Sequence, residues 1–153
     1  MRILCAVGVG SVLVVGAASP AGAVLAPEAD LAYHGRVSMT RGIVDVRLIP
    51  QNHGPSAVKD ATVRLSWSAA LTDAQRLPGA CARVGARAVV CRTGALAADG
   101  LGAAIGLTVR LRGVPSEVAM EIETVWSGGA ADRNHGNDRQ RVLALDTGDS
   151  YVF

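Results

Sequence analysis

The chain has 153 residues, of which 50% are hydrophobic and only 3% are aromatic. Its formal net charge of +2 at pH 7 is close to neutral, so the composition gives no argument for binding to nucleic acid or to an anionic membrane. The length suits one domain of the usual size, about 100–150 residues.

The N-terminal segment has the pattern of a secretory signal peptide. Arg2 supplies a positive charge, an apolar run extends over Ile3–Val15, and the small residues Ala21 and Ala23 mark a cleavage site. The apolar run is shorter than the roughly 20 residues that a membrane-spanning helix needs. We therefore predict a signal peptide over residues 1–23, cleaved after Ala23, and a secreted protein with no membrane anchor after cleavage. An uncleaved anchor is the alternative.

Cleavage would remove Cys5 and leave two cysteines, Cys81 and Cys91. An even number of cysteines in an exported chain favours a disulfide. A tight turn near Gly85 and Ala86 would pair the two cysteines across a β-hairpin. Closing so short a loop would stabilise the fold by about 3 kcal/mol in the chain-entropy model. Two free buried thiols are the alternative.

The segments after residue 30 alternate between apolar and polar side chains, which is typical of strands with one buried face. Residues 24–30 form a short leader. The clearest strands are predicted around 44–48, 63–67, 107–111 and 118–122, and the weaker ones at 31–37, 80–84, 87–92 and 141–145. Turn-rich stretches separate them, and only short helical turns are conceivable, at 69–76 and 95–104. The pattern predicts an all-β protein, an antiparallel β-sandwich of about seven to eight strands over residues 31–146, with a C-terminal tail at 147–153.

Two loops carry groups that could bind a ligand. The Asn52–Ser56 turn is either a binding loop or a simple connection between strands. The loop at residues 132–138 holds carboxylates and amides, which are oxygen donors that suit Ca²⁺, but its spacing is not that of an EF-hand.

The sequence predicts no enzyme, no catalytic residue and no cofactor. His34, His53 and His135 are far apart, and no G-x-S-x-G motif is present. Trp67 and Trp126 stand at the apolar phase of their strands, which predicts core rings with satisfied indole N–H groups. An exposed aromatic platform is the alternative.

The tail ends in an aromatic pair, Tyr151 and Phe153. These rings would either dock onto the sandwich or form a partner-binding segment that adds to a sheet edge.

Four segments, taken in order, resemble motifs of one domain family. They lie at Asn52–Ala57, Leu77–Gly79, Cys91–Gly100 and Asp132–Asp138. In that order they resemble the family's motifs N-x-G-P-S-x-A, L-P-x-G, C-x-L-G-x-L-x-x-G and D-x-N-x-x-N-N. Together they resemble the conserved-repeat Ig-like domain of exported and cell-surface bacterial proteins, whose function is unknown, over about residues 43–145. The resemblance implies an Ig-like β-sandwich with no enzyme chemistry. Thr93 departs from the usual apolar residue and Asp138 from the second Asn of the final turn.

We therefore expect a secreted, non-catalytic Ig-like module with a structural or protein-binding role at or outside the bacterial cell surface. Its partner would be a protein or a component of the cell wall. A carbohydrate- or calcium-binding module that uses loop 132–138 is the alternative.

Overall fold

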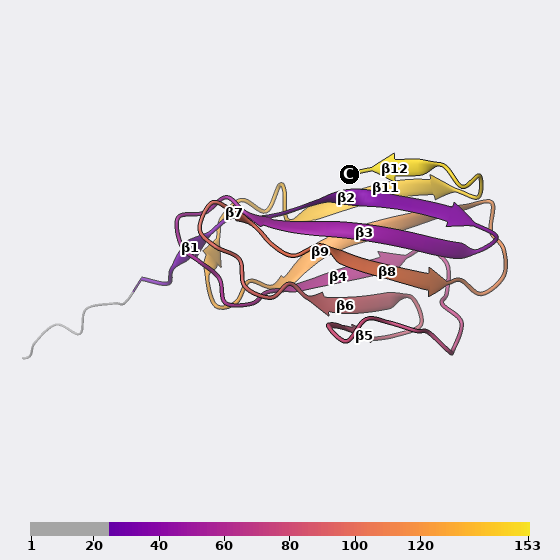
Figure 1. Ribbon diagram of the computed structural model, residues 1–153, viewed down its shortest axis with the longest axis horizontal. Helices are drawn as coiled ribbons and strands as arrows, with labels where there is room; N and C mark the ends of the chain where they lie inside the picture. The colour runs from indigo at the N-terminus through magenta and orange to yellow at the C-terminus, as the bar shows by residue number, and fades with distance from the viewer. Residues whose placement is uncertain (1–24) are drawn as a thin grey trace, which may run out of the picture.

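The computed structural model describes residues 25–153, so the predicted signal peptide and the cleavage site at Ala23 lie outside the described residues. This range contains twelve β-strands and no helix, arranged as two five-stranded sheets and a two-stranded pair (Figure 1). The predicted all-β class is confirmed. The predicted strand number is too low, chiefly because three strands have only two residues each and are too short to show an alternating pattern.

The first sheet has the order β12-β2-β3, with β7 and β8 both paired to the far edge of β3. Its strands are β2 (Leu31–Thr40), β3 (Ile43–Asn52), β7 (Gly100–Leu101), β8 (Ile105–Arg110) and β12 (Ser150–Val152). All of these pairings are antiparallel. The sheet therefore ends with β12 on one side and with β8 on the other (Figure 1).

The second sheet has the order β11-β9-β4-β6-β5, and it is also antiparallel throughout. Its strands are β4 (Thr62–Trp67), β5 (Cys81–Arg83), β6 (Ala88–Arg92), β9 (Glu117–Trp126) and β11 (Arg139–Leu145). The strands predicted at 80–84, 87–92 and 141–145 are thus present with slightly different ends. In place of helical turns, segment 69–76 contains an isolated bridge, and segment 95–104 contains an isolated bridge, a turn and β7.

One hydrophobic core joins the two sheets. Val37, Val44 and Val46 of the first sheet pack in one cluster with Leu65 and Met120 of the second. Each fully buried aliphatic side chain of this kind contributes roughly 1.5–3 kcal/mol. The alternation of the sequence places these residues on one face of each strand, and the two apolar faces cover each other. This arrangement is consistent with the predicted β-sandwich.

The predicted leader is partly structured. Its last residues include β1 (Glu28–Ala29), which pairs in parallel with β10 (Ala131–Asp132). Ala29 is buried in a second, smaller hydrophobic cluster with Leu31 and Leu96. The sandwich therefore begins a few residues before the predicted boundary at residue 31.

A two-residue turn joins β2 to β3, and both of its residues, Arg41 and Gly42, have positive φ. Such turns match the twist of the flanking strands. Gly42 is required because a Cβ there would collide with the backbone oxygen of Gly113. The less usual Arg41 is held by a carboxylate oxygen of Asp146, which accepts a hydrogen bond from its backbone N–H.

Candidate functional site

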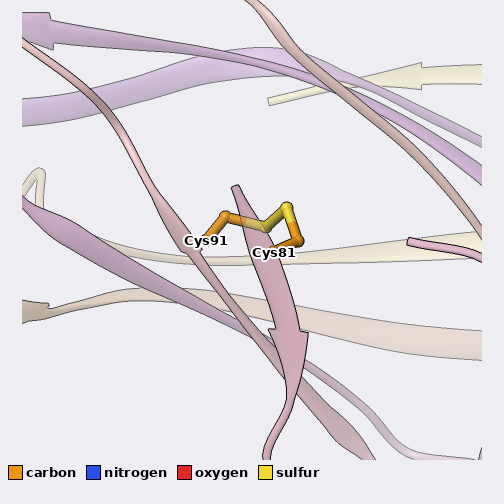
Figure 2. Close-up of a disulfide and its surroundings, with 2 residues drawn as sticks. All are labelled: Cys81 and Cys91. Atoms are coloured by element: carbon orange, nitrogen blue, oxygen red, sulfur yellow. A yellow bond between two sulfur atoms is a disulfide. The ribbon is translucent and has the colours of Figure 1, made fainter. Parts of the chain in front are cut away.

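The predicted disulfide is confirmed. Cys81 and Cys91 are direct partners in the β5–β6 ladder, with Cα atoms 4.1 Å apart, and their sulfur atoms are bonded (Figure 2). The connection between the two strands is centred on Gly85 and Ala86, as predicted. Cys91 is fully buried, whereas Cys81 is half-buried on the strand that ends the second sheet. The bond thus fixes the edge strand β5 to its neighbour, and it suits an oxidising, extracellular environment.

The loop at residues 132–138 holds the start of β2 in place. Asp132 accepts hydrogen bonds from the backbone N–H groups of Leu31 (2.8 Å) and Asn134 (3.0 Å). The side-chain amide of Asn137 donates to a carboxylate oxygen of Asp30 at 2.8 Å. The carboxylates considered as calcium ligands therefore already accept hydrogen bonds from the protein itself. Within residues 25–153, no group of three or more His, Cys, Asp or Glu side chains is arranged to hold a metal ion.

A cleft of about 400 Å³ lies beside this loop, between Glu123 of β9 and His135. Nδ1 of His135 lies 3.0 Å from a carboxylate oxygen of Asp138. This hydrogen bond and the attraction of the carboxylate raise the pKa of His135 above its ordinary value, although the ring is fully exposed. Burial raises the pKa of Tyr33 to about 12, and its hydroxyl is hydrogen-bonded to Thr124, which lines the cleft. The cleft combines an exposed imidazole with a carboxylate, while His34 and His53 lie in other elements and are not bonded to it.

The Asn52–Ser56 turn has a structural role. The Asn52 side chain is completely buried and makes four hydrogen bonds. Its oxygen accepts from the backbone N–H groups of Asp30 and Gly54, and its amide donates to the carbonyls of Ser56 and Ala97. A side chain with every polar atom satisfied inside the fold holds the turn together and is not available to a ligand.

The two tryptophans differ. Trp67 lies in the core, with 3% of its surface exposed, as predicted, but its indole nitrogen has no hydrogen-bond partner among the described residues. The core position predicted for Trp126 is wrong, because 51% of its surface is exposed. The register between β4 and β9 shifts at Thr62 and Val63, so Val125 is an extra residue on β9 and the alternation is lost.

The C-terminal tail docks on the sandwich, which confirms the first alternative predicted for the Tyr151 and Phe153 rings. Strand β12 pairs with β2, and Tyr151 and Phe153 pack against the main core. The backbone groups of Phe153 and Gly35 exchange two hydrogen bonds, at 3.0 and 3.1 Å. This edge of the first sheet is thus covered by the chain itself.

The other edge of the same sheet is open and borders a hollow of the described surface. A groove of about 980 Å³ lies between β8 and the segment Ala74–Pro78. A second hollow of about 500 Å³ continues along β8 toward Ala103 and shares Pro78 and Gly106 with the first. Together they form one trough, which we call the β8 groove.

Among residues 25–153, the last residue of β8, Arg110, is the one residue of this strand whose backbone bonds to a partner outside β3. The side-chain amide of Gln75 accepts a hydrogen bond from the Arg110 N–H and donates one to the Arg110 carbonyl, both at 2.9 Å. Thr72 also donates its backbone N–H to that carbonyl. Gln75 thus takes the place that a residue of a further strand would occupy. Farther along the groove, Asp45 accepts a hydrogen bond from the Thr108 hydroxyl at 2.5 Å.

The β8 groove could not be predicted from the sequence. The pattern of residues 106–110 predicts a strand but not its place at the end of a sheet. The only local signal is the outward row of Gly106 and Thr108, which is small and polar. Gln75 is 35 positions from Arg110, so no sequence spacing connects them.

No family model, characterised protein or solved structure matches the chain. Across residues 25–153, no helix is long and apolar enough to cross a membrane.

Proposed function

We propose that the chain is an exported, non-catalytic Ig-like module that binds a protein partner, and that the β8 groove is the binding site. The observation that carries this proposal is the long trough beside the open edge of β8. Unpaired strand edges are templates for pairing with another chain. The groove is lined by backbone, by apolar side chains and by polar and charged side chains that include Asp45, Arg76 and Arg110, and within the described part of the chain no histidine, cysteine or serine lines it.

The order of the strands supports the Ig-like part of the proposal. In Ig-like sandwiches, strands A, B and E lie in one sheet and strands C, F and G in the other. Here β2, β3 and β8 share one sheet, and β4, β9 and β11 share the other. The buried Trp67 on β4 stands on the strand that carries the buried tryptophan of many Ig domains. Membership in the conserved-repeat Ig-like family, argued from the four sequence motifs, remains part of this proposal.

Export is supported by the signal-peptide pattern and by the disulfide between Cys81 and Cys91. We test it by measuring the intact mass of the native protein in medium, wall and membrane fractions, with and without reduction. A chain that starts at Val24 and gains the two thiol hydrogens on reduction supports export. A full-length chain confined to membranes would contradict it.

The binding role is tested by placing a photo-cross-linking amino acid at position 108, in the groove, and at position 141 as a control. Arg141 is exposed on β11, in the other sheet. Cross-links from position 108 alone, mapped by mass spectrometry to one segment of one exported protein, support the proposal. Equal cross-linking from both positions, or none from position 108, would overturn it.

A further inference from the structure

We infer that the occupant of the β8 groove is an extended acidic peptide segment, which adds to β8 as a further strand. The inference deepens the proposed function and depends on it, because it names the chemistry and the conformation of the partner.

The backbone of β8 offers peptide groups toward the groove at alternate residues. In an antiparallel ladder, successive residues direct their N–H and C=O groups to opposite sides. Arg110 directs both groups away from β3, to Gln75. By alternation Thr108 and Gly106 also direct their groups away from β3, while Leu107 and Val109 bond to it. Two donors and two acceptors at Gly106 and Thr108 therefore face the groove.

Gln75 sets where an added strand must end. Its amide already bonds the Arg110 backbone, and just beyond it Arg112 donates its N–H to the carbonyl of Ala70 at 2.7 Å. The chain itself covers the edge from Arg110 onward. In the opposite direction the trough continues past Gly106 to Ala103. At about 3.4 Å per residue, the stretch from Ala103 to Thr108 accommodates an extended segment of five or six residues.

The charges around the groove select the partner. Two carboxylates line the groove, of which Asp60 is paired with Arg92 and Asp45 accepts the hydrogen bond from the Thr108 hydroxyl. The charges without an ion-pair partner are mainly arginines, since Arg76 and Arg110 also line the groove and Arg47 lies beside Gly106 in the ladder. No ion pair within residues 25–153 involves any of these three arginines. Arg47 also stands directly opposite Arg36, and like charges across a ladder destabilise it. Carboxylates on the incoming strand would relieve this repulsion.

The same charges disfavour a second copy of the chain. Two copies joined by their β8 edges would form an interface in which the same surface meets itself. The group of Arg47, Arg76 and Arg110 of one copy would then lie near the same group of the other, with Asp45 the one lining carboxylate among the described residues of each copy that is not in an ion pair. An acidic strand has no such cost, so we assign the groove to a heterologous acidic segment.

The experiment measures fluorescence anisotropy of labelled seven-residue peptides with the oxidised protein. One peptide alternates valine with glutamate, a second alternates valine with lysine, and a third alternates valine with threonine. We expect the glutamate peptide to bind roughly tenfold more tightly than the lysine peptide and to weaken as salt is raised. Arg76→Gln should weaken it about twofold, and Arg133→Gln, in the distant loop, should leave it unchanged.

The strand geometry is tested with Thr108→Pro and with Thr108→Ala as the matched control. Both changes remove the hydroxyl bonded to Asp45, but only proline removes the N–H that faces the groove. Proline is tolerated on an edge strand where its missing N–H would face outward. We expect Thr108→Pro to weaken the glutamate peptide at least about fivefold and Thr108→Ala less than about twofold. Where the proline variant does not fold, N-methylated peptides remove the reciprocal hydrogen bonds, which the peptide N–H groups would donate to the carbonyls of Gly106 and Thr108.

The outcomes separate the inference from the proposed function. Equal binding of the threonine and glutamate peptides, still sensitive to Thr108→Pro, would overturn the acidic preference and leave strand addition in place. If neither Thr108→Pro nor N-methylation of the peptide weakens binding of the glutamate peptide, strand addition would be overturned. Failure of every peptide, with specific cross-linking from position 108, would overturn the inference but not the binding role. Dimerisation abolished by Thr108→Pro would assign the edge to a second copy instead.

Discussion

The two edges of the first sheet are treated differently by the same chain. At the β2 edge, the C-terminal strand β12 adds to the sheet, and Gly35 and Phe153 exchange two backbone hydrogen bonds. At the β8 edge, one side chain, Gln75, pairs with one residue, Arg110, and the rest of the edge borders a groove. The comparison shows that this sheet accepts an added strand, because the protein supplies one to itself at the closed edge.

The closed edge also indicates what an added strand needs. Tyr151 and Phe153 point to the core, while Val152 between them is 81% exposed. An added strand thus combines backbone hydrogen bonds with side chains that fill the gap between the sheets at alternate positions. At the open edge, the corresponding gap is the β8 groove.

The largest effect on stability is expected at β5, the edge strand of the second sheet, which the disulfide joins to β6. Cys81→Ser breaks the bond that joins β5 to β6, and the loop it closes spans 10 positions, so we expect a loss of about 3 kcal/mol in the free energy of unfolding. Chemical denaturation measures this loss. Amide exchange should rise around residues 74–83 and not in β12. A Cys81→Ser protein as stable as the wild type, or further destabilised by reductant, would show that the Cys81–Cys91 disulfide does not hold β5 to β6.

A smaller loss is expected when the closed edge is weakened. Phe153→Ala removes a half-buried ring that lies over Gly35, where a Cβ would come within 2.8 Å of the ring. We expect a loss of about 2 kcal/mol in the free energy of unfolding. Val152→Ala is the matched control on the same strand, and we expect it to change stability by less than about 0.5 kcal/mol because Val152 is exposed. Equal effects of the two changes would mean that the tail does not pack as a strand.

Removing the Gln75 side chain, which caps the open edge at Arg110, should reduce the free energy of unfolding by a smaller amount. Gln75→Ala leaves the Arg110 N–H without its partner and weakens the hold on segment 72–77. We expect a loss of about 1 kcal/mol in the free energy of unfolding, measured by thermal denaturation. The neighbouring exposed residue gives the control, since Arg76→Ala should have almost no effect. If Gln75→Ala leaves the stability unchanged, the Gln75 side chain does not stabilise the open edge.

The smallest effect is expected in loop 132–138, beside the start of β2. Because Asp138 raises the pKa of His135 in the folded protein, the pair stabilises the fold fully below about pH 6.5 and less as the pH rises through the raised pKa. NMR titration of the ring should give a midpoint above 6.5, and Asp138→Asn should lower it. A midpoint that does not respond to Asp138→Asn would show that the hydrogen bond does not form in solution.

The sequence predicted those features that depend on local alternation. Residues 44–48 and 118–122 have one apolar face each, and they form strands of the core. The failure at Trp126 has a physical cause, since one extra residue on β9 ends the alternation and neither β4 nor β9 alone reveals it. The disulfide could be predicted because both cysteines lie on one short hairpin.

The candidate site depends on contacts that are distant in sequence. The open edge exists because β8 pairs only with β3 and because Gln75 reaches Arg110, and neither fact follows from the pattern of residues 105–110. The arginines that flank the groove come from three separate segments, so the net charge of the chain does not show that they lie close together. Edge and groove are properties of the assembled sheets.

The most direct test of the account is amide hydrogen exchange of Gly106 and Thr108, followed by NMR with and without the valine–glutamate peptide. In the protein alone, we expect these two amides to exchange rapidly, while those of Leu107 and Val109, bonded to β3, are protected. Saturating peptide should slow exchange at Gly106 and Thr108 specifically. Peptide binding that leaves both amides as fast as before, or slow exchange at both in its absence, would contradict an open edge that accepts a strand.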